Sequence, residues 1–405
     1  MKKLIFTLFV LITSVFAQFE VEGYVAFDSQ VFSNKQNKHS SSLTLEQQLE
    51  MEYSYENFNL NLKVYAQEDN SDSNNNDKKN NERSFVEIKE LNSSVEFENS
   101  QFSFGKSIQF WGALEVKNIV DTFNLQETRN DIFQTDKRGA YSVEYDYYFD
   151  ESELSLIVKL YEQDSKVASS SYIYSLLNGT EKFDENIHTE KSQYRPTVYL
   201  KYTGTLSEDY SLDYAFIVQN GYDSQRYLTK QNNTYTQNSY LVNKFMTYNT
   251  LVLDSTLYKL EAVYTDVLED NTVSDYFHVA LGVEHTLDAL SNGSEIGLIG
   301  EYYYYETVND KKLDDIDLSE VFQNDLFLGL RYSLNDEDDS SAVGGVILDM
   351  QYDEQSYYVE YTTRVLEMFK MKFDYRYVEP SKEESTAYSR MGRHQRVALN
   401  ISYHF

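Results

Sequence analysis

The last eleven residues of the chain, 395–405, read Gln-Arg-Val-Ala-Leu-Asn-Ile-Ser-Tyr-His-Phe. Apolar side chains stand at every second position from Val397 to Phe405, and polar or small side chains stand between them. Because successive side chains of a β-strand point to opposite faces, this pattern predicts a strand with one apolar and one polar face. Such a strand suits a soluble sheet, whose apolar face meets a core. It equally suits a membrane barrel, whose apolar face meets lipid.

The same alternation recurs along the whole chain and predicts about 18 strands, with about 16 as the alternative count. The segment Leu43–Tyr55 shows it most clearly, and Glu56-Asn57 turns the chain into the next strand, Phe58–Ala66. In the candidate strand Phe85–Phe97 the parity slips near Glu90, which predicts either a β-bulge or a miscount.

The predicted connections alternate between short and long ones. Glu56-Asn57 and Glu98–Ser100 are short, whereas Asp28–Ser42, Gln67–Arg83 and Trp111–Arg138 are long. Both chain ends lie on the side of the short connections, which is the layout of a bacterial outer-membrane barrel. No fixed-period repeat indicates a propeller or a solenoid. We therefore predict an all-β protein: a single transmembrane, antiparallel, up-and-down β-barrel with short periplasmic turns and long external loops.

The composition agrees with a membrane barrel. The chain has 37 Tyr and 24 Phe but only 2 Pro. Tyrosine suits the membrane interface, where its ring is apolar and its hydroxyl meets water, and scarce proline suits long, fully paired strands. The mean hydropathy of −0.57 excludes a helical membrane protein. It is compatible with a barrel, in which only alternate residues of a strand face lipid.

Residues 1–17 have the pattern of a secretory signal peptide. Lys2 and Lys3 precede an apolar run, Leu4–Val15, and a small-residue site ends at Ala17. The apolar run is shorter than the roughly 20 residues that span a bilayer. We expect cleavage after Ala17, a barrel over residues 18–405, and no separate plug domain before the first strand, which argues against an energised receptor.

The charge balance and the absence of cysteine exclude several classes of function. Lys and Arg total 35 against 66 Asp and Glu, and there is no Cys. An acidic surface of this kind repels nucleic acid, so no nucleic-acid partner is expected. Thiol chemistry and a disulfide scaffold are excluded.

Two stretches resemble known outer-membrane proteins. A terminal strand that ends on an aromatic residue, here Phe405, resembles the last strand of bacterial outer-membrane β-barrels. That resemblance implies recognition of Phe405 by the barrel assembly machinery and a place in the outer membrane of a Gram-negative cell. It also implies contact with lipid and lipopolysaccharide, with a homotrimer as an assembly common in the class.

The second stretch, Phe104–Asn124, resembles a pattern of porin-like outer-membrane families. In that pattern a strand ends in Gly-Arg-Gln and is followed by Trp-Gly and spaced Asn, Asp and Asn. Here Lys106 stands in place of the usual Arg. In porins of this size the third external loop folds into the lumen. The resemblance therefore implies that residues 111–138 form a constriction, although an ordinary solvated loop is the alternative. The candidate constriction residues are Glu115, Asp121, Glu127, Arg129 and Asp131.

The polar faces of the last strands predict a basic ladder on one wall of the lumen. Adjacent strands lie about 4.8 Å apart, so basic residues at inward positions of neighbouring strands come close together. An acidic loop facing a basic wall would orient charged and polar solutes. The alternative is that these residues neutralise lumen acids such as Glu20, Glu22 and Glu360. The candidate ladder residues are Arg364, Lys370, Lys372, Arg376 and Arg396.

No motif predicts catalysis, a metal site or a cofactor. The six histidines stand in no nucleophile motif and show no His-x-x-x-His spacing, and His278 and His285 should face opposite sides of one strand. The acidic stretches Asp310–Asp317 and Asp336–Asp339 lack the ligand order of a Ca²⁺ loop and are expected to be solvated turns.

The leading functional hypothesis is an outer-membrane porin, a water-filled passive diffusion channel for small polar solutes or ions. A barrel of about 18 strands encloses an aqueous lumen unless it is plugged. The alternatives are a gated or substrate-specific channel for hydrophobic or aromatic compounds or for a polysaccharide, and a non-conducting structural barrel. The acidic excess favours cations and the basic ladder opposes this, so ion preference is left open.

Overall fold

The computed structural model describes most of the chain. The predicted signal peptide and the acidic stretch Asp310–Asp317 lie outside the described residues. The described residues are 19–33, 39–74, 83–133, 136–168, 170–175, 177, 179–207, 210–270, 272–287, 290–309, 320–382 and 386–405.

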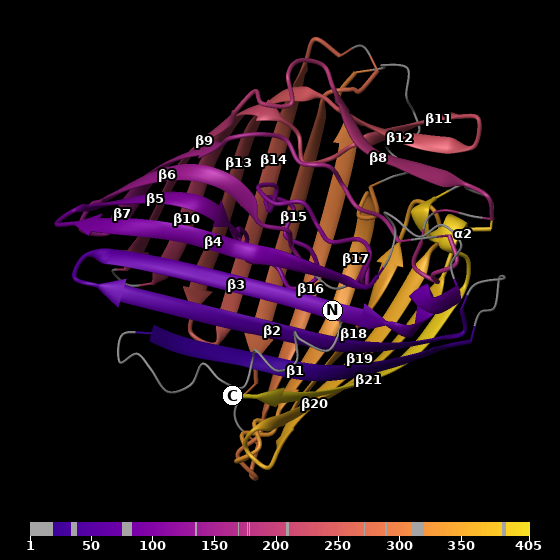
Figure 1. The fold of residues 1–405 in the computed structure, drawn as a ribbon. Helices are drawn as coiled ribbons and strands as arrows, with labels where there is room; N and C mark the ends of the chain where they lie inside the picture. The colour runs from indigo at the N-terminus through magenta and orange to yellow at the C-terminus, as the bar shows by residue number, and fades with distance from the viewer. Residues whose placement is uncertain are drawn as a thin grey trace.

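Eighteen strands form one closed antiparallel barrel, which confirms the predicted fold (Figure 1). Each strand pairs with the next along the barrel, and the last strand pairs with the first. The barrel strands are β1 (Phe19–Phe32), β2 (Ser41–Tyr55), β3 (Phe58–Asp69), β4 (Phe85–Phe97), β5 (Ser100–Ser107), β6 (Ala140–Tyr148), β7 (Ser152–Lys159), β9 (Thr197–Ser207), β10 (Ser211–Tyr222), β13 (Leu241–Leu253), β14 (Thr256–Leu268), β15 (Tyr276–Thr286), β16 (Glu295–Thr307), β17 (Asn324–Ser333), β18 (Ser341–Asp349), β19 (Gln355–Val365), β20 (Phe369–Glu379) and β21 (His394–His404).

The seam between β1 and β21 depends on Phe405. The Gly23 amide donates to the Phe405 carbonyl at 3.0 Å, and the Phe405 amide donates back to the Gly23 carbonyl at 3.0 Å. The Phe405 ring covers Gly23, where a Cβ atom would lie 2.9 Å from the ring and 2.5 Å from the Gln48 carbonyl oxygen. Glycine at position 23 therefore allows the close approach that closes the barrel.

The outward faces are apolar and carry tyrosines near the strand ends. On β21 the outward side chains Val397, Leu399 and Ile401 are exposed, whereas the inward Arg396 and Ala398 are buried. Near the long-loop end several tyrosine hydroxyls donate to polar side chains at the rim. Such bonds run from Tyr302 to Asn324 (2.9 Å), from Tyr304 to Glu306 (2.6 Å) and from Tyr357 to Gln355 (2.7 Å). A ring in an apolar zone with its hydroxyl toward water is the expected arrangement at a membrane interface.

The parity slip in β4 is a β-bulge, which decides between the two explanations that the sequence left open. Lys63 of β3 lies opposite Glu90, but the next residue, Val64, lies opposite Ile88, so Lys89 is the extra residue. The bulge turns both Lys89 and Glu90 inward. Lys89 pairs with Asp136 of the β5–β6 loop, and the Lys63 ammonium lies 3.4 Å from Glu90. The bulge thus adds one more charge to the lumen wall.

The long connections carry further elements that the alternation pattern did not predict. A three-stranded sheet lies beyond the barrel rim and is built by β8 (Lys182–Thr189), β11 (Tyr227–Gln231) and β12 (Thr234–Ser239), with β8 and β12 parallel (Figure 1). These short polar strands were not predicted from the sequence, because pairing between two loops fixes them. Among the described residues, two short helices, η1 (Asn70–Asn74) and α2 (Ala387–Met391), lie in other connections.

The first strand is longer than predicted. It was expected to end at Phe27, with a loop from Asp28, but β1 continues to Phe32. Asp28 and Gln30 are polar residues at inward positions, and a polar inward face cannot be told from a loop by composition. Within the described part of the chain, no helix is long and apolar enough to cross a membrane.

Candidate functional site

The inward faces of the barrel differ between two parts of the wall. On β6, β7, β9, β10 and β13–β18 many inward side chains belong to one apolar cluster. On β19–β21 and β1–β5 the inward side chains are mostly charged or carry amides, and several of them form ion pairs. We call these two parts the packed half and the ionic half.

The first part of the β5–β6 loop folds into the barrel against the packed half. Trp111, Leu114, Ile119, Val120 and Phe123 of this loop are buried. They share the apolar cluster with inward side chains of the strands, and Trp111 and Phe123 lie edge-on to the Tyr199 ring, at 5.4 and 5.5 Å between ring centroids. Removal of this apolar surface from water holds the loop inside the barrel. The inward side chains of the cluster include Ile157, Tyr199, Ile217, Met246, Val263, Ile299 and Phe327.

One strand glutamate, Glu261, fixes the backbone of this loop. Glu261 of β14 accepts hydrogen bonds from the amides of Ala113 (2.7 Å), Ile119 (2.7 Å) and Val120 (3.4 Å). Hydrogen bonds to a carboxylate are stronger than those between neutral groups, so they hold the loop to the strand. A Cβ atom at Gly112 would lie 2.5 Å from the Glu261 carboxylate, so glycine fits this position.

A second glutamate, Glu301 of β16, acts on the same loop. It accepts from the amides of Glu115 (2.6 Å) and Val116 (3.1 Å) and from the Tyr303 hydroxyl (2.7 Å). Neither glutamate was predicted from the sequence. Their signal was an acidic residue at an inward position beside an apolar inward one, as in Glu261 before Val263 and Glu301 after Ile299.

The second part of the same loop lies against the ionic half and is held by charges. Arg129 makes a two-point contact with Glu127, at 2.8 and 2.6 Å, and Lys137 pairs with Asp121. Asp131 pairs with Arg396 of β21. Burial alone would raise the pKa of Asp131, but Arg396 and Arg376 outweigh burial and hold that pKa below its usual value.

The five candidate constriction residues therefore have two kinds of surroundings. Asp121, Glu127, Arg129 and Asp131 are largely buried and each faces an oppositely charged partner. Glu115 is exposed and lies 2.6 Å from Arg331 of β17. Glu115 is thus the member of this set that meets solvent in the lumen.

The contact between Glu115 and Arg331 continues into a row of charges. Arg331 lies 2.7 Å from Glu284, which lies 3.1 Å from Lys259. These residues belong to β17, β15 and β14, so the row follows the wall of the packed half beside the inserted loop. It joins an exposed loop carboxylate to three neighbouring strands.

The five candidate ladder residues lie on inward faces of β19, β20 and β21. The register places Arg364 opposite Lys370, and Arg376 opposite both Tyr358 and Arg396. Four of the five face acids: Arg396 pairs with Asp131 and Asp374, Arg376 lies 3.6 Å from Asp374, Lys372 lies 2.7 Å from Glu360, and Arg364 lies 2.9 Å from Asp339. Lys370 is exposed and forms no ion pair with a described residue.

A segment of the β7–β9 connection lies at the long-loop end of the ionic half, in a contact that was not predicted from the sequence. Tyr172, Ile173 and Tyr174 are each 1% exposed. They pack in one cluster with side chains of β1, β20, α2 and the β5–β6 loop. A sequence signal existed in the run of Ser-Tyr-Ile-Tyr inside a polar loop.

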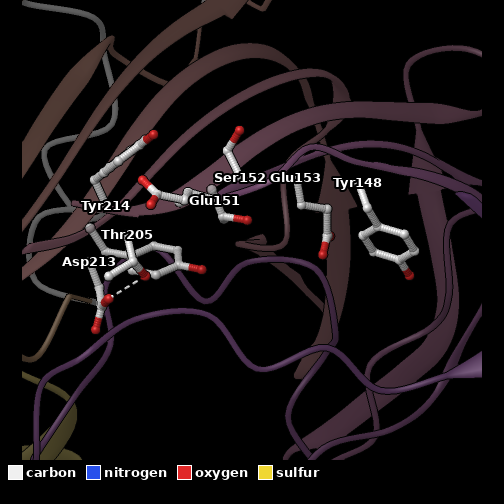
Figure 2. Close-up of a pocket in the computed structure, with 10 residues that line it drawn as sticks. Tyr148, Glu151, Ser152, Glu153, Thr205, Asp213 and Tyr214 are labelled. Atoms are coloured by element: carbon white, nitrogen blue, oxygen red, sulfur yellow. Dashed lines mark hydrogen bonds between the residues drawn. The ribbon is translucent and has the colours of Figure 1, made fainter. Parts of the chain in front are cut away.

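The short-turn end of the packed half is hollow and acidic. A cavity of about 390 Å³ lies between the ends of β6, β7, β9, β10 and β13. Figure 2 shows Glu153 and Tyr148 on one side of it and Asp213 and Thr205 on the other, where the Thr205 hydroxyl donates to Asp213 at 2.7 Å. The apolar filling of the packed half therefore does not extend to this end of the lumen.

The histidines form no site in the described structure. His278 is buried and faces inward beside Tyr305, whereas His285 faces outward and contacts Thr256 at 2.8 Å, so the two lie on opposite faces as predicted. No group of three or more potential metal ligands occurs among the described residues.

Comparison with solved structures shows the fold. No protein-family model and no curated protein matches the sequence. OccAB4 of Acinetobacter baumannii has a TM-score of 0.59 at 9% identity, and the match covers 96% of this chain and 97% of that one. OccAB1 of the same organism gives 0.58 at 7% identity, covering 96% of each chain. OccK8 (OprE) of Pseudomonas aeruginosa gives 0.57 at 8% identity, covering 96% and 98%.

Proposed function

Given that the chain has the fold of an outer-membrane β-barrel channel, we propose that it is a porin, a water-filled passive diffusion channel for small polar solutes or ions. The observation that carries the proposal is that charged side chains on the inward faces are in contact with solvent. The side chains of Lys63, Glu50, Lys372 and Arg331 are 23%, 32%, 31% and 37% exposed. Water therefore reaches both halves of the interior, while the outward faces are apolar.

The inserted β5–β6 loop supports a constriction over residues 111–138. We place its solute-facing side at Glu115 with Arg331, because the other candidate residues are turned toward buried partners. The wall of the ionic half supplies further exposed charges, among them Lys372 with Glu360. A solute between these walls would meet both signs of charge, which favours small polar, charged or zwitterionic molecules over long apolar ones.

The lumen charges favour cations. Four of the five ladder residues are offset by acids, whereas the register sets Glu20 opposite Glu52 and Glu22 opposite Glu50 on neighbouring strands. Like charges that lie directly opposite repel each other, so mobile cations would stabilise this wall. Glu20, Glu22 and Glu52 are exposed and form no ion pair with described residues. We therefore propose a cation preference.

We also propose where the chain is located and what it assembles with. The chain would be exported with cleavage after Ala17 and inserted in the bacterial outer membrane by the barrel assembly machinery, which would read Phe405. Its partners would be lipid and lipopolysaccharide, and a homotrimer is the proposed assembly.

The test is a current measurement on the refolded mature chain in a planar bilayer with a salt gradient. Discrete, stable current steps and a reversal potential of the sign for cations are expected. Changing Glu20 and Glu22 together to Gln should move the reversal potential toward zero. The matched control is Glu98→Gln, an exposed carboxylate in the β4–β5 turn. A folded barrel that passes no current would overturn the proposed function.

A further inference from the structure

Three aromatic side chains from different parts of the chain form a box at the outer end of the ionic half. Phe32 ends β1, Phe133 stands in the β5–β6 loop, and His394 begins β21. The Tyr174 ring fills the space between them. It lies edge-on to Phe32 at 5.6 Å and to Phe133 at 5.7 Å, and 4.9 Å from the His394 ring. Its hydroxyl lies 3.2 Å from the His394 Nε2 atom.

Arginines stack on the two tyrosines at this place. The Arg83 guanidinium carbon lies 3.8 Å from the centre of the Tyr172 ring, and that of Arg396 lies 5.7 Å from the centre of the Tyr174 ring. A guanidinium over an aromatic face is attracted by the ring electrons. The Tyr174 ring thus packs edge-on against Phe32 and Phe133. The Arg396 guanidinium lies over the face of the ring, and its hydroxyl contacts an imidazole nitrogen of His394.

The tyrosines come from a distant part of the barrel. Their segment, residues 170–175, belongs to the connection between β7 and β9 in the packed half, yet it reaches the ends of β1 and β21. The segment lies over Arg396, the residue that pairs with Asp131 and Asp374. The segment thus contributes to the burial of Arg396, which is 1% exposed.

The segment forms a local turn and accepts a backbone hydrogen bond from outside, from the His39 amide to the Ser171 carbonyl (3.0 Å). Its own turn is closed by bonds within it or next to it, from the Ser175 amide to the Tyr172 carbonyl (3.1 Å) and from the Ser175 hydroxyl to the Ala168 carbonyl (2.7 Å). The Tyr172 hydroxyl is buried and has no hydrogen-bond partner among the described residues. An unsatisfied buried hydroxyl opposes the closed position, because water would satisfy that group once the segment left.

We propose that the box of Phe32, Phe133 and His394 is a binding site for uncharged phenolic solutes, that Tyr174 occupies it as an internal substitute, and that a solute opens the outer mouth by taking its place. The inference rests on the proposed channel function. A phenol shares with Tyr174 the ring and the hydroxyl that the box contacts. An aromatic carboxylate fits less well, because Arg396 already faces two carboxylates and a third would be repelled.

Single-channel recording with p-cresol on the loop side tests the proposal. The wild type should show a small current step without p-cresol, and p-cresol should increase the size of that step. Tyr174→Ala should show the larger step without p-cresol and should not respond to it. The matched control is Tyr194→Ala, an exposed tyrosine of the same connection, which should behave as the wild type does. Heat-dependent migration on a gel verifies that each variant is folded.

A probe without a hydroxyl and a variant of His394 test the contribution of the hydrogen bond separately from that of the ring. Toluene, which lacks the hydroxyl, should act about tenfold more weakly than p-cresol, as expected for one lost hydrogen bond. His394→Phe keeps the ring and should reduce the response to p-cresol by a similar factor while leaving the response to toluene unchanged. Benzoate acting better than p-cresol would overturn the assignment to uncharged phenols.

The outcome also distinguishes this inference from the channel function. If wild type and Tyr174→Ala conduct equally and neither responds to p-cresol, the inference fails and the channel function stands. If neither conducts although both are folded, the channel function fails. Calorimetry then measures whether p-cresol binds to the folded Tyr174→Ala protein, which tests the binding site independently of conduction. Binding supports the site, and absence of binding overturns it.

Discussion

The packed half and the ionic half of the lumen are both covered by loop segments that fold inward, but different forces hold these segments. In the packed half, residues 111–123 bury apolar side chains and give their backbone amides to Glu261 and Glu301. In the ionic half, residues 127–133 and 136–138 are held mainly by ion pairs, and residues 170–175 are held by arginine–aromatic contacts together with a smaller apolar cluster.

The difference matters because water and polar solutes can replace some contacts and not others. Buried apolar surface loses its stabilisation whenever water reaches it, so the packed half acts as a fixed filling. A charge or a hydroxyl can exchange its protein partner for water or for a solute at a modest net cost. The ionic half is therefore the side on which passage and regulation are expected, and four experiments test this difference between the halves.

The largest effect is expected from Arg396→Met. This change leaves Asp131 and Asp374 buried beside each other without their shared cation. Loss of one partner from a buried ion pair costs about 3–5 kcal/mol of the free energy of unfolding. Urea unfolding of the refolded barrel measures this cost. Adding Asp131→Asn and Asp374→Asn should recover part of it, and a loss below about 1 kcal/mol would mean that ion pairs do not hold this half.

A smaller effect is expected from Glu261→Gln in the packed half. The side chain keeps its shape but loses the charge that accepts three loop amides, and hydrogen bonds to a charged group contribute about 1.5–3 kcal/mol. We expect lower stability in urea and a noisier, larger single-channel current, because the inserted loop is held less firmly. Glu153→Gln, on an inward position near the short-turn end, serves as control. An unchanged current would show that apolar contacts alone fix the loop.

A moderate effect is expected from acid, through Asp131 of the ionic half. The pKa of Asp131 is lowered in the folded protein, because Arg396 and Arg376 outweigh the effect of burial. The stability that this carboxylate contributes is thus fully present above the ordinary carboxyl pKa near 4, and it is lost as the pH falls through the lowered value. Unfolding measured against pH should show this loss in the wild type. Asp131→Asn should flatten that part of the profile, and an identical profile in both proteins would contradict the assignment.

The smallest effect is expected from Lys370→Gln combined with Lys372→Gln. Both side chains are solvent-accessible, and exposed ion pairs contribute about 0–1 kcal/mol, so stability should barely change. The reversal potential should nevertheless move by a few mV toward stronger cation preference, because two lumen cations are removed. Lys182→Gln, in a strand beyond the barrel rim, is the control. A shift of the opposite sign would mean that these lysines do not face the ion path.

Much of the fold could be predicted because it depends on local alternation. The closing strand, the number of barrel strands and the bulge beside Glu90 all follow from which residues stand at odd and even positions. The inward positions of Arg376 and Arg396 follow from the same parity. A strand in lipid must keep one face apolar, and the sequence of each strand must meet this requirement separately.

The candidate site in the lumen was harder to predict, because it brings together residues that lie far apart in the chain. The loop charges at Glu127, Arg129 and Asp131 were visible in the sequence, but their burial depends on partners that the fold supplies. The β8–β12 pairing and the contact of residues 170–175 with β1 and β21 join segments that local patterns treat independently.

The sequence by itself determined the barrel, the direction in which each strand side chain points and the sorting of short and long connections, since a repeating constraint of the membrane acts on every strand. Only the tertiary structure decided which half of the lumen is filled, which charges remain exposed to solvent and where Tyr174 is seated. Those properties depend on how loops fold back onto distant strands, and the free energy of such contacts belongs to pairs of residues that no local pattern connects.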